Sequence, residues 1–221
     1  MKKWYRILYG TAAFCILGTL FFLFLLPETV PAHYNLAGEI DRYGSRWEYL
    51  LFPGFTLGMT VFFRIIAKAA GGHGDSSGEK GTLITASVTV FFTGFLGFYF
   101  MGKAMRHGTD GTDIAQCIGI PLGVLLIVIG LILPRTEKNG TFGLRTVWSM
   151  RNENTWKKSQ RFCGICAIVC GGGLSIGAFF LRGLPCFLLM LLTAAVWANA
   201  RIVASWYIAK KDRSDGTERQ E

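Results

Sequence analysis

Six long apolar segments separated by short polar pieces constrain this chain more than any other feature. A helix needs about 20 apolar residues to cross a hydrocarbon core of about 30 Å, and only a helix or a closed barrel pairs its own backbone groups in lipid. We therefore predict an all-α, polytopic membrane protein with six transmembrane helices and no separate soluble domain. The predicted spans are residues 7–26, 49–66, 83–101, 114–133, 162–181 and 186–208.

The distribution of basic residues predicts how these spans are oriented. Most of the 23 lysines and arginines fall on the side that, with six spans, holds both termini. Lysine and arginine are enriched in cytoplasmic loops, so we expect both termini and the loop at residues 134–161 to be cytoplasmic. Topology and the anionic inner leaflet then explain the net charge of +9, and no direct nucleic-acid partner is required.

Sequence signatures of catalysis and of ion pumping are missing. The predicted spans contain no aspartate or glutamate that could relay protons, and no nucleophile elbow, His-Glu-Xaa-Xaa-His motif or phosphate-binding glycine loop occurs. We expect no enzymatic activity, no cofactor and no metal. Arg201 is the one charge deep within a span. We expect it to snorkel to the inner interface, and the alternative is a functional charge.

The outer loop at residues 27–48 is rich in turn-forming residues, and we expect a compact series of turns there. Its polar side chains are a candidate recognition surface for something arriving from outside: His33, Asn35, Asp41 and Glu48. The alternative is an interfacial loop that closes the first two spans. A third and weaker possibility is a zinc site at His33 with Glu39 or Asp41, which lacks a second nearby histidine.

One long basic and aromatic segment, residues 139–161, lies between the fourth and fifth spans. Its polar residues exclude it from a spanning helix, and its regularly placed tryptophans and arginines indicate a structured loop at a membrane face. Residues 139–150, followed by Glu153, Trp156 and Arg161, resemble the signature loop of the SdpI family. Val147 stands where that family usually has proline, and Gln160 stands where histidine is frequent.

The amino-terminal region carries a second resemblance. Residues 26–41 resemble a conserved membrane domain of unknown function that often precedes the SdpI signature loop. The two resemblances together divide the chain into an amino-terminal membrane domain at residues 1–70, with the outer loop at 27–48, and an SdpI-like membrane domain at residues 71–221, with the cytoplasmic loop at 134–161.

The family resemblance implies a bacterial plasma-membrane protein of the bacteriocin-immunity type. It implies an immunity or receptor-like role, in which the protein protects its cell against a secreted antimicrobial peptide, and signalling to a cytoplasmic regulator is also associated with the family. The alternative is a small transporter or a membrane enzyme acting on a lipid or cell-envelope precursor. The expected partners are membrane lipids, a peptide toxin and a regulatory protein, and the oligomeric state stays open.

The same resemblance suggests which loop residues act. Partner docking and an interfacial lid on lipid headgroups are equally compatible with their basic and aromatic character. The candidate residues of the cytoplasmic loop are Gly143, Arg145, Thr146, Trp148, Trp156 and Arg161.

Overall fold

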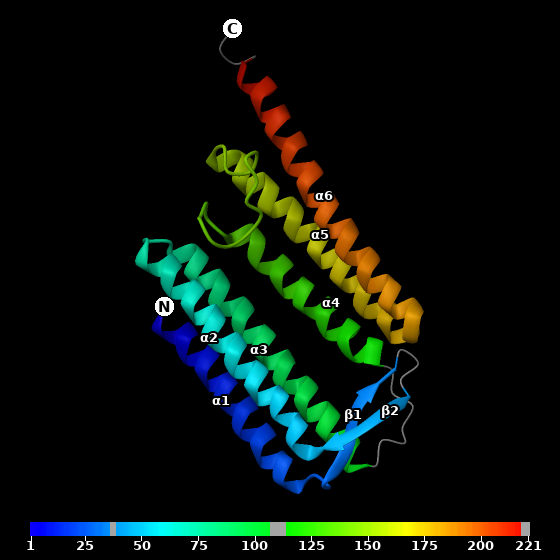
Figure 1. Ribbon diagram of the computed structural model, residues 1–221. Coiled ribbons are helices and arrows are strands. Elements are labelled where there is room, and N and C mark those ends of the chain that lie inside the picture. Colours follow the sequence, from blue (N-terminus) through cyan, green and yellow to red (C-terminus); the bar gives the residue numbers. More distant parts are fainter. Residues whose placement is uncertain (36–38, 107–113, 218–221) are drawn as a thin grey trace.

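Six long helices make up most of the protein in the computed structural model, which describes residues 1–35, 39–106 and 114–217 (Figure 1). Each helix is long and apolar enough to cross a membrane. The prediction of six spanning helices is therefore confirmed by their length and composition. The helices are α1 (Lys2–Leu25), α2 (Leu51–Gly72), α3 (Ser76–Met105), α4 (Ile114–Ile132), α5 (Glu153–Phe180) and α6 (Gly183–Thr217).

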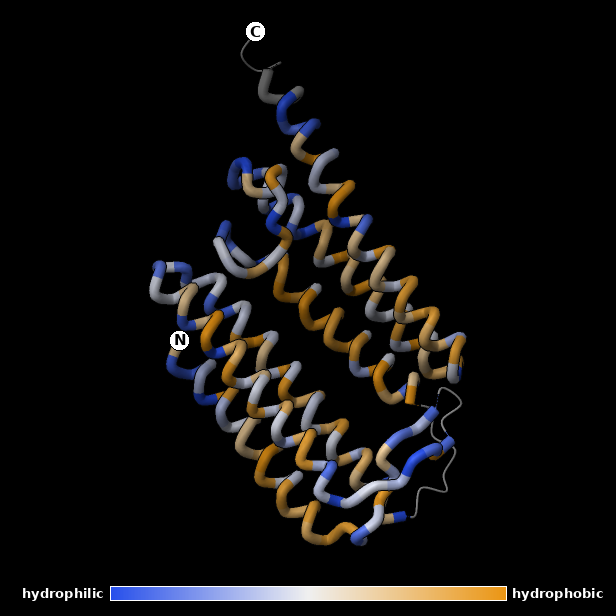
Figure 2. The backbone as a smooth tube through the Cα atoms, viewed as in Figure 1, coloured by the Kyte–Doolittle hydropathy of each residue, from blue (hydrophilic) through white to orange (hydrophobic). Residues whose placement is uncertain are grey.

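The helices form two groups of three. Helices α1, α2 and α3 pack on one another, as do α4, α5 and α6, and the two groups meet where α3 runs beside α4 (Figure 1). We refer to this boundary between α3 and α4 as the seam. Hydrophobic residues fill the middle of the helices and hydrophilic residues gather towards their ends (Figure 2). This pattern matches helices with apolar centres and polar ends in a bilayer.

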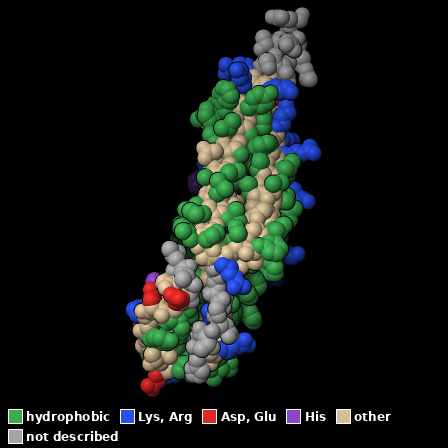
Figure 3. All heavy atoms as spheres, turned by 90° about the vertical axis from the view of Figure 1, so that its right-hand side faces the viewer, with side chains coloured by type: hydrophobic (Ala, Val, Ile, Leu, Met, Phe, Trp, Pro, Cys, Tyr) green, Lys and Arg blue, Asp and Glu red, His purple; other side chains and the backbone are tan. Residues whose placement is uncertain are grey.

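The two ends of the bundle differ in character. One end holds the N-terminus, the α2–α3 turn, the α4–α5 loop and the C-terminal part of α6, and we name it the basic face (Figure 1). The other end, the hairpin face, holds the segment between α1 and α2 and the α5–α6 turn. In the side view, Lys and Arg side chains surround the upper part of α6 and also occur at the lower end, where the acidic side chains visible from this side gather (Figure 3).

Glycines let α4 and α5 approach closely. A Cβ atom added at Gly164 would lie 2.6 Å from the carbonyl oxygen of Gly130, and one added at Gly130 would lie 2.6 Å from that of Gly164. The two backbones are therefore in direct contact, which is how small residues promote helix association in membranes. Gly172, further along α5, has open space where a side chain would be.

The segment between α1 and α2 forms a two-stranded antiparallel hairpin, so the expectation of turns alone was wrong. Strands β1 (Thr29–Tyr34) and β2 (Ile40–Ser45) pair from Thr29 opposite Ser45 to Tyr34 opposite Ile40. The register is irregular between Pro31 and Tyr34. A proline in the strand and this irregularity obscure the alternating pattern by which a strand is recognised in sequence.

The hairpin is fixed to the helices that flank it. Val30 is fully buried in a cluster that includes Leu23 of α1 and Met101 of α3. The Tyr49 hydroxyl donates to the carbonyl oxygen of Pro31 at 2.7 Å, and Arg46 donates to that of Leu26 at 3.0 Å. The predicted compactness of this segment is therefore confirmed, although it is achieved by strand pairing.

Candidate functional site

The loop between α4 and α5 is folded, and its first turn is organised by Asn139. We name residues 136–152 the signature loop. The Asn139 side-chain oxygen accepts hydrogen bonds from the backbone N–H groups of Thr141 and Phe142, at 2.9 and 2.7 Å, and its amide donates to the carbonyl of Glu137 at 2.9 Å. A buried asparagine that satisfies local backbone groups is a standard way to build a turn.

Gln160 of α5 supports the middle of the signature loop. It is fully buried and forms hydrogen bonds with both the N–H and the carbonyl of Leu144. Gly143 precedes Leu144 with a φ of +107°, a conformation that side chains disfavour, and a Cβ there would lie 2.8 Å from the Gln160 oxygen. The glycine of the signature motif is therefore needed to bring the backbone close to Gln160.

The loop next turns back on itself and reaches α6. The Ser149 hydroxyl donates to the carbonyl of Leu144 at 2.7 Å and accepts from the N–H of Thr146 at 2.9 Å. The Thr146 hydroxyl contacts that of Ser205 on α6 at 3.1 Å. Thr146 therefore joins the loop to the last helix, which is a structural role that the sequence did not indicate.

Trp156 is fully buried below the loop. Its indole N–H donates to the carbonyl of Thr136 at 2.9 Å, so that the start of α5 is connected to the start of the signature loop. The sequence grouped Trp156 with the exposed docking residues. Asn152 caps α5 through the N–H of Thr155, and this helix start places Trp156 and Gln160 one turn apart on the same buried face. The capping pattern was the available signal for this placement.

A carboxylate on α6 completes the junction. Asp212 accepts hydrogen bonds from Asn152 at 3.0 Å, from Thr155 at 2.9 Å and from Lys158 at 3.2 Å, and Asn154 also donates to it. These contacts hold the start of α5 against the C-terminal part of α6. Asp212 lies beyond the apolar span predicted at residues 186–208, so the hydropathy pattern did not indicate its role.

The signature loop also crosses the seam. The N–H of Glu137 donates to the Ser77 hydroxyl, and the N–H of Gly140 donates to the Asp75 carboxylate, both at 3.1 Å. Phe142 packs where Gly81 of α3 leaves room for its ring. Asp75 also caps α3 by accepting from the N–H of Gly78. The loop therefore connects the two three-helix groups at the basic face.

Two predicted loop arginines, Arg145 and Arg161, are exposed, and the Trp148 side chain is half-buried. Trp148 lines a cleft of about 340 Å³ between the signature loop and α6, which we name the basic cleft. The lining is aromatic and cationic: Trp148, Arg151, Trp206, Ala209, Lys210 and Arg213. Such a surface suits an acidic or phosphate-bearing group held against aromatic rings. The sequence indicated Trp148 as a candidate residue. It did not indicate that Trp206, Lys210 and Arg213 of α6 line the same cleft.

Arg201, which we expected to snorkel to the inner interface, lies beside the signature loop. Its guanidinium lies 4.3 Å from the centre of the Trp197 ring, and it lines a cavity of about 180 Å³ with Phe142 and Leu144 of the signature loop and Cys163 of α5. The Trp197 and Arg201 pair is one helical turn apart, which allows a cation–π contact. The signature loop therefore covers an arginine that faces the bundle.

The predicted recognition residues of the hairpin are exposed and are joined to other polar groups. His33 lies 2.6 Å from Asp41. The amide of Asn35 donates to Glu39 at 2.8 Å, and Arg42 donates to both carboxylate oxygens of Glu48, at 3.2 and 2.8 Å. The structure thus places His33 and Asp41 on the paired strands, Asn35 just after β1, and Glu48 in a short 3-10 helix, Arg46–Leu50, that follows β2. It also adds Arg42 of β2, which the sequence pattern did not indicate.

The arrangement of metal-binding side chains bears on the zinc alternative. Within residues 1–35, 39–106 and 114–217, no group of three or more histidine, cysteine, aspartate or glutamate side chains is placed to hold a metal ion. His33 and Asp41 meet as a pair, and Asn35 engages Glu39. Of the residues named in the zinc alternative, the described part of the hairpin therefore brings His33 and Asp41 together as a hydrogen-bonded pair.

Comparison with known families confirms both predicted resemblances. Residues 135–205 match the SdpI/YfhL protein family, and residues 10–57 match a domain of unknown function, DUF1648. The first region begins where the signature loop begins and ends at Ser205, the residue that Thr146 contacts. The matched region therefore includes the signature loop, α5 and α6 as far as residue 205.

Two relatives are similar over part of the chain. The immunity protein SdpI of Bacillus subtilis is 32% identical over 99 residues, which cover 45% of this chain and 47% of that protein. The chain thus spans about half the length of this relative. An uncharacterized protein of Archaeoglobus fulgidus is 61% identical over 28 residues, 13% of this chain and 15% of that protein. No solved structure matches the chain significantly.

Proposed function

We propose that this protein is a membrane-embedded immunity factor that protects its cell against a secreted antimicrobial peptide without turning over a substrate. The similarity to the immunity protein SdpI, together with the match of residues 135–205 to its family, carries the proposal. The folded signature loop supports it, because its main contacts are made by residues of the matched region: Leu144, Thr146, Trp156, Gln160 and Ser205.

The proposed orientation places the basic face in the cytoplasm of a bacterial plasma membrane and the hairpin outside. The concentration of lysine and arginine at the basic face supports this orientation, since positive residues are retained on the cytoplasmic side. Both termini would then be inside. Fusion of a fluorescent protein or of alkaline phosphatase to the C-terminus tests this orientation. We expect the fluorescent-protein fusion to fluoresce and the alkaline phosphatase fusion to be inactive. A dark fluorescent-protein fusion together with an active phosphatase fusion would show the opposite orientation.

The hairpin is the proposed outer recognition surface. Its polar side chains are exposed and are held in fixed pairs, such as His33 with Asp41 and Arg42 with Glu48. Pre-arranged polar groups bind a partner with less loss of conformational entropy than mobile ones. The peptide would contact this surface from the outer leaflet or from the water above it.

The basic cleft is the proposed cytoplasmic docking surface. Trp148, Arg151 and Lys210 could bind an acidic segment of a regulatory protein, with exposed Arg145 and Arg161 on the same face. Trp156, which is buried, and Gly143, which lies against Gln160, would then act by shaping the loop. Signalling through this surface is the second part of the proposal and is independent of protection.

Survival of a sensitive bacterium tests the proposal. Cells expressing the protein are challenged with peptide toxins encoded beside its gene, and protection by the intact chain is expected. Asp41→Lys and Glu48→Lys should reduce survival with unchanged membrane abundance, whereas Lys138→Gln on the opposite face should not. A correctly inserted protein that gives no protection would favour the alternative, a small transporter or an enzyme acting on a lipid or envelope precursor.

A further variant separates docking from protection. Trp148→Ala together with Arg151→Gln should abolish binding of a cytoplasmic regulator while leaving membrane abundance and survival unchanged. If these substitutions instead lower abundance, the cleft residues are an interfacial lid required for folding.

A further inference from the structure

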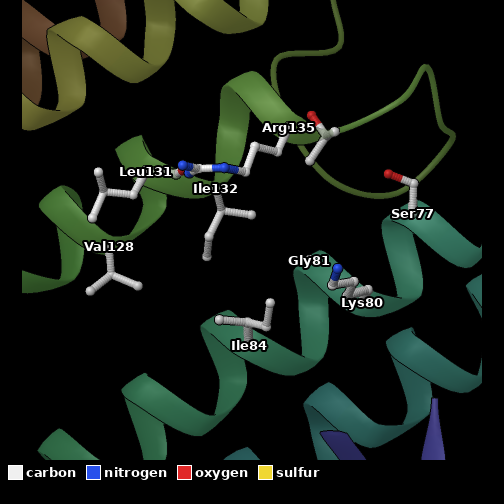
Figure 4. Close-up of a pocket in the computed structure, with 9 residues that line it drawn as sticks. Ser77, Lys80, Gly81, Ile84, Val128, Leu131, Ile132 and Arg135 are labelled. Carbon is white, nitrogen blue, oxygen red and sulfur yellow. The ribbon is translucent and has the colours of Figure 1, made fainter.

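A cavity of about 200 Å³ lies in the seam near the basic face, between α3 and the end of α4 (Figure 4). It is distinct from the basic cleft and from the Arg201 cavity, with which it shares no lining residue. Nine residues line it: Ser77, Lys80, Gly81, Ile84, Val128, Leu131, Ile132, Arg135 and Thr136.

The cavity lining is divided by chemistry along the membrane normal. Lys80 lies near the start of α3, and Arg135 follows the end of α4 in a short 3-10 helix, Leu133–Arg135. Ile84 is one helical turn beyond Lys80, and Val128 and Ile132 face it from α4 (Figure 4). Two cationic side chains and a hydroxyl therefore come from the helix ends, with an apolar wall deeper in the bundle. The Arg135 guanidinium reaches back along α4 and donates to the carbonyl of Leu131 (Figure 4).

Charge at this cavity is of one sign. Of the nine described residues that line it, two are basic and none is acidic. The nearby carboxylate of Asp75 is engaged by the N–H groups of Gly78 and Gly140. An occupant with a negative group at the cationic end and a hydrocarbon part at the other would match both halves of the lining.

Access to the cavity favours an occupant that arrives through the bilayer. The signature loop crosses the seam at its basic end, where Glu137 bonds to Ser77 and Gly140 to Asp75. Leu131, on the cavity wall, is 49% exposed, so the wall reaches the outer surface of the helices. That surface faces lipid in a membrane protein whose helices span the bilayer.

We propose that this cavity binds an anionic phospholipid. The headgroup phosphate would lie between Lys80 and Arg135 with Ser77 beside it, and the first part of an acyl chain would lie along Ile84, Val128 and Ile132. The volume accommodates the phosphate and glycerol region, and the rest of the lipid continues into the bilayer. A lipid held there bridges α3 and α4, and so supports the seam from within the membrane. The inference does not depend on the immunity function.

Native mass spectrometry of the full chain, purified in mild detergent, tests the proposal. With phosphatidylglycerol, the intact protein should keep one lipid bound at a collision energy that strips phosphatidylcholine. Lys80→Gln with Arg135→Gln should weaken this retention about tenfold, since both charges near the phosphate are lost. The matched control, Lys138→Gln with Lys157→Gln, removes the same charge from the same face outside the cavity and outside the basic cleft, and should behave as the unaltered protein.

A second variant addresses the apolar wall without changing charge. Ile84→Trp fills the cavity from α3 and should displace the bound phosphatidylglycerol while the protein stays folded. Millimolar inorganic phosphate should not compete, because it lacks the hydrocarbon part. Equal retention of phosphatidylcholine and phosphatidylglycerol, equal retention by the double variant and its control, or displacement by inorganic phosphate would each overturn the proposal.

Discussion

Gln160 binds the backbone of Leu144 through both ends of its side-chain amide. Its oxygen accepts from the Leu144 N–H at 3.1 Å, and its nitrogen donates to the Leu144 carbonyl at 2.9 Å. Gln160 belongs to α5 and Leu144 to the signature loop, so this contact fixes the loop to a spanning helix. Arg145, the next residue, is consequently held at the surface. The loop can present basic side chains in defined positions because it is supported from below.

Replacing Gln160 with methionine should destabilise the protein. Methionine has a similar length and no amide, so both hydrogen bonds are lost. The Leu144 carbonyl keeps the bond from Ser149, whereas its buried N–H has no other partner in the described contacts. An orphaned buried donor costs about 1–3 kcal/mol, and the free energy of unfolding should fall by about 2 kcal/mol in a denaturant titration in detergent. Lys157→Met, exposed on the same helix, should change it by less than about 0.5 kcal/mol.

Substitution of Gly143 by alanine should strain the signature loop. The φ of +107° disfavours any side chain, and the new Cβ would lie 2.8 Å from the Gln160 oxygen. We expect the free energy of unfolding to fall by about 1–3 kcal/mol and proteolysis within the loop to become faster. Gly140→Ala is the matched control, because nothing lies within 4 Å of its added Cβ. Equal proteolysis rates for the two variants would contradict a special role for Gly143.

Trp156→Phe should be more damaging than Trp148→Phe, although the sequence placed both in one functional set. Trp156 is 0% exposed and donates to Thr136, so phenylalanine leaves a void and an unpaired carbonyl. We expect the free energy of unfolding to fall by about 2–4 kcal/mol. Trp148 is half-buried at the rim of the basic cleft, and its replacement should change the free energy of unfolding by less than about 1 kcal/mol. Thermal unfolding followed by the remaining tryptophans measures both.

Hydropathy predicted the spans well and their ends poorly, for a physical reason. Helices α3 and α5 begin at Ser76 and Glu153, ahead of the apolar segments predicted at residues 83 and 162. Asp75 and Asn152 cap these starts with side-chain oxygens, and the helices therefore continue through polar turns beyond the lipid. A search for long apolar segments detects only the apolar part of a helix and not its polar first turns.

The sequence predicted the candidate site as a region, and the structure shows where each of its side chains lies. The unusual composition of residues 139–161 predicted a structured loop, and Arg145 and Arg161 of this loop are exposed. Asp212, Ser205 and Trp206 contribute from α6, and their proximity depends on how the helices pack. Local sequence patterns carry no information on such distant contacts. The sequence shows that Trp197 and Arg201 are one helical turn apart, but it does not show that the Arg201 side chain lies beside the signature loop.

Gly164→Ala and Gly172→Ala should have opposite effects, although both lie on α5. The Cβ added at Gly164 would be 2.6 Å from the Gly130 carbonyl oxygen and 2.8 Å from the Pro134 ring, so α4 and α5 must separate at a cost of about 1–3 kcal/mol. At Gly172 the space is open, and alanine favours a helix over glycine by up to about 1 kcal/mol. Unfolding midpoints in detergent should therefore fall for the first variant and hold or rise for the second. If both midpoints are unchanged, the glycine contact between α4 and α5 does not stabilise the bundle.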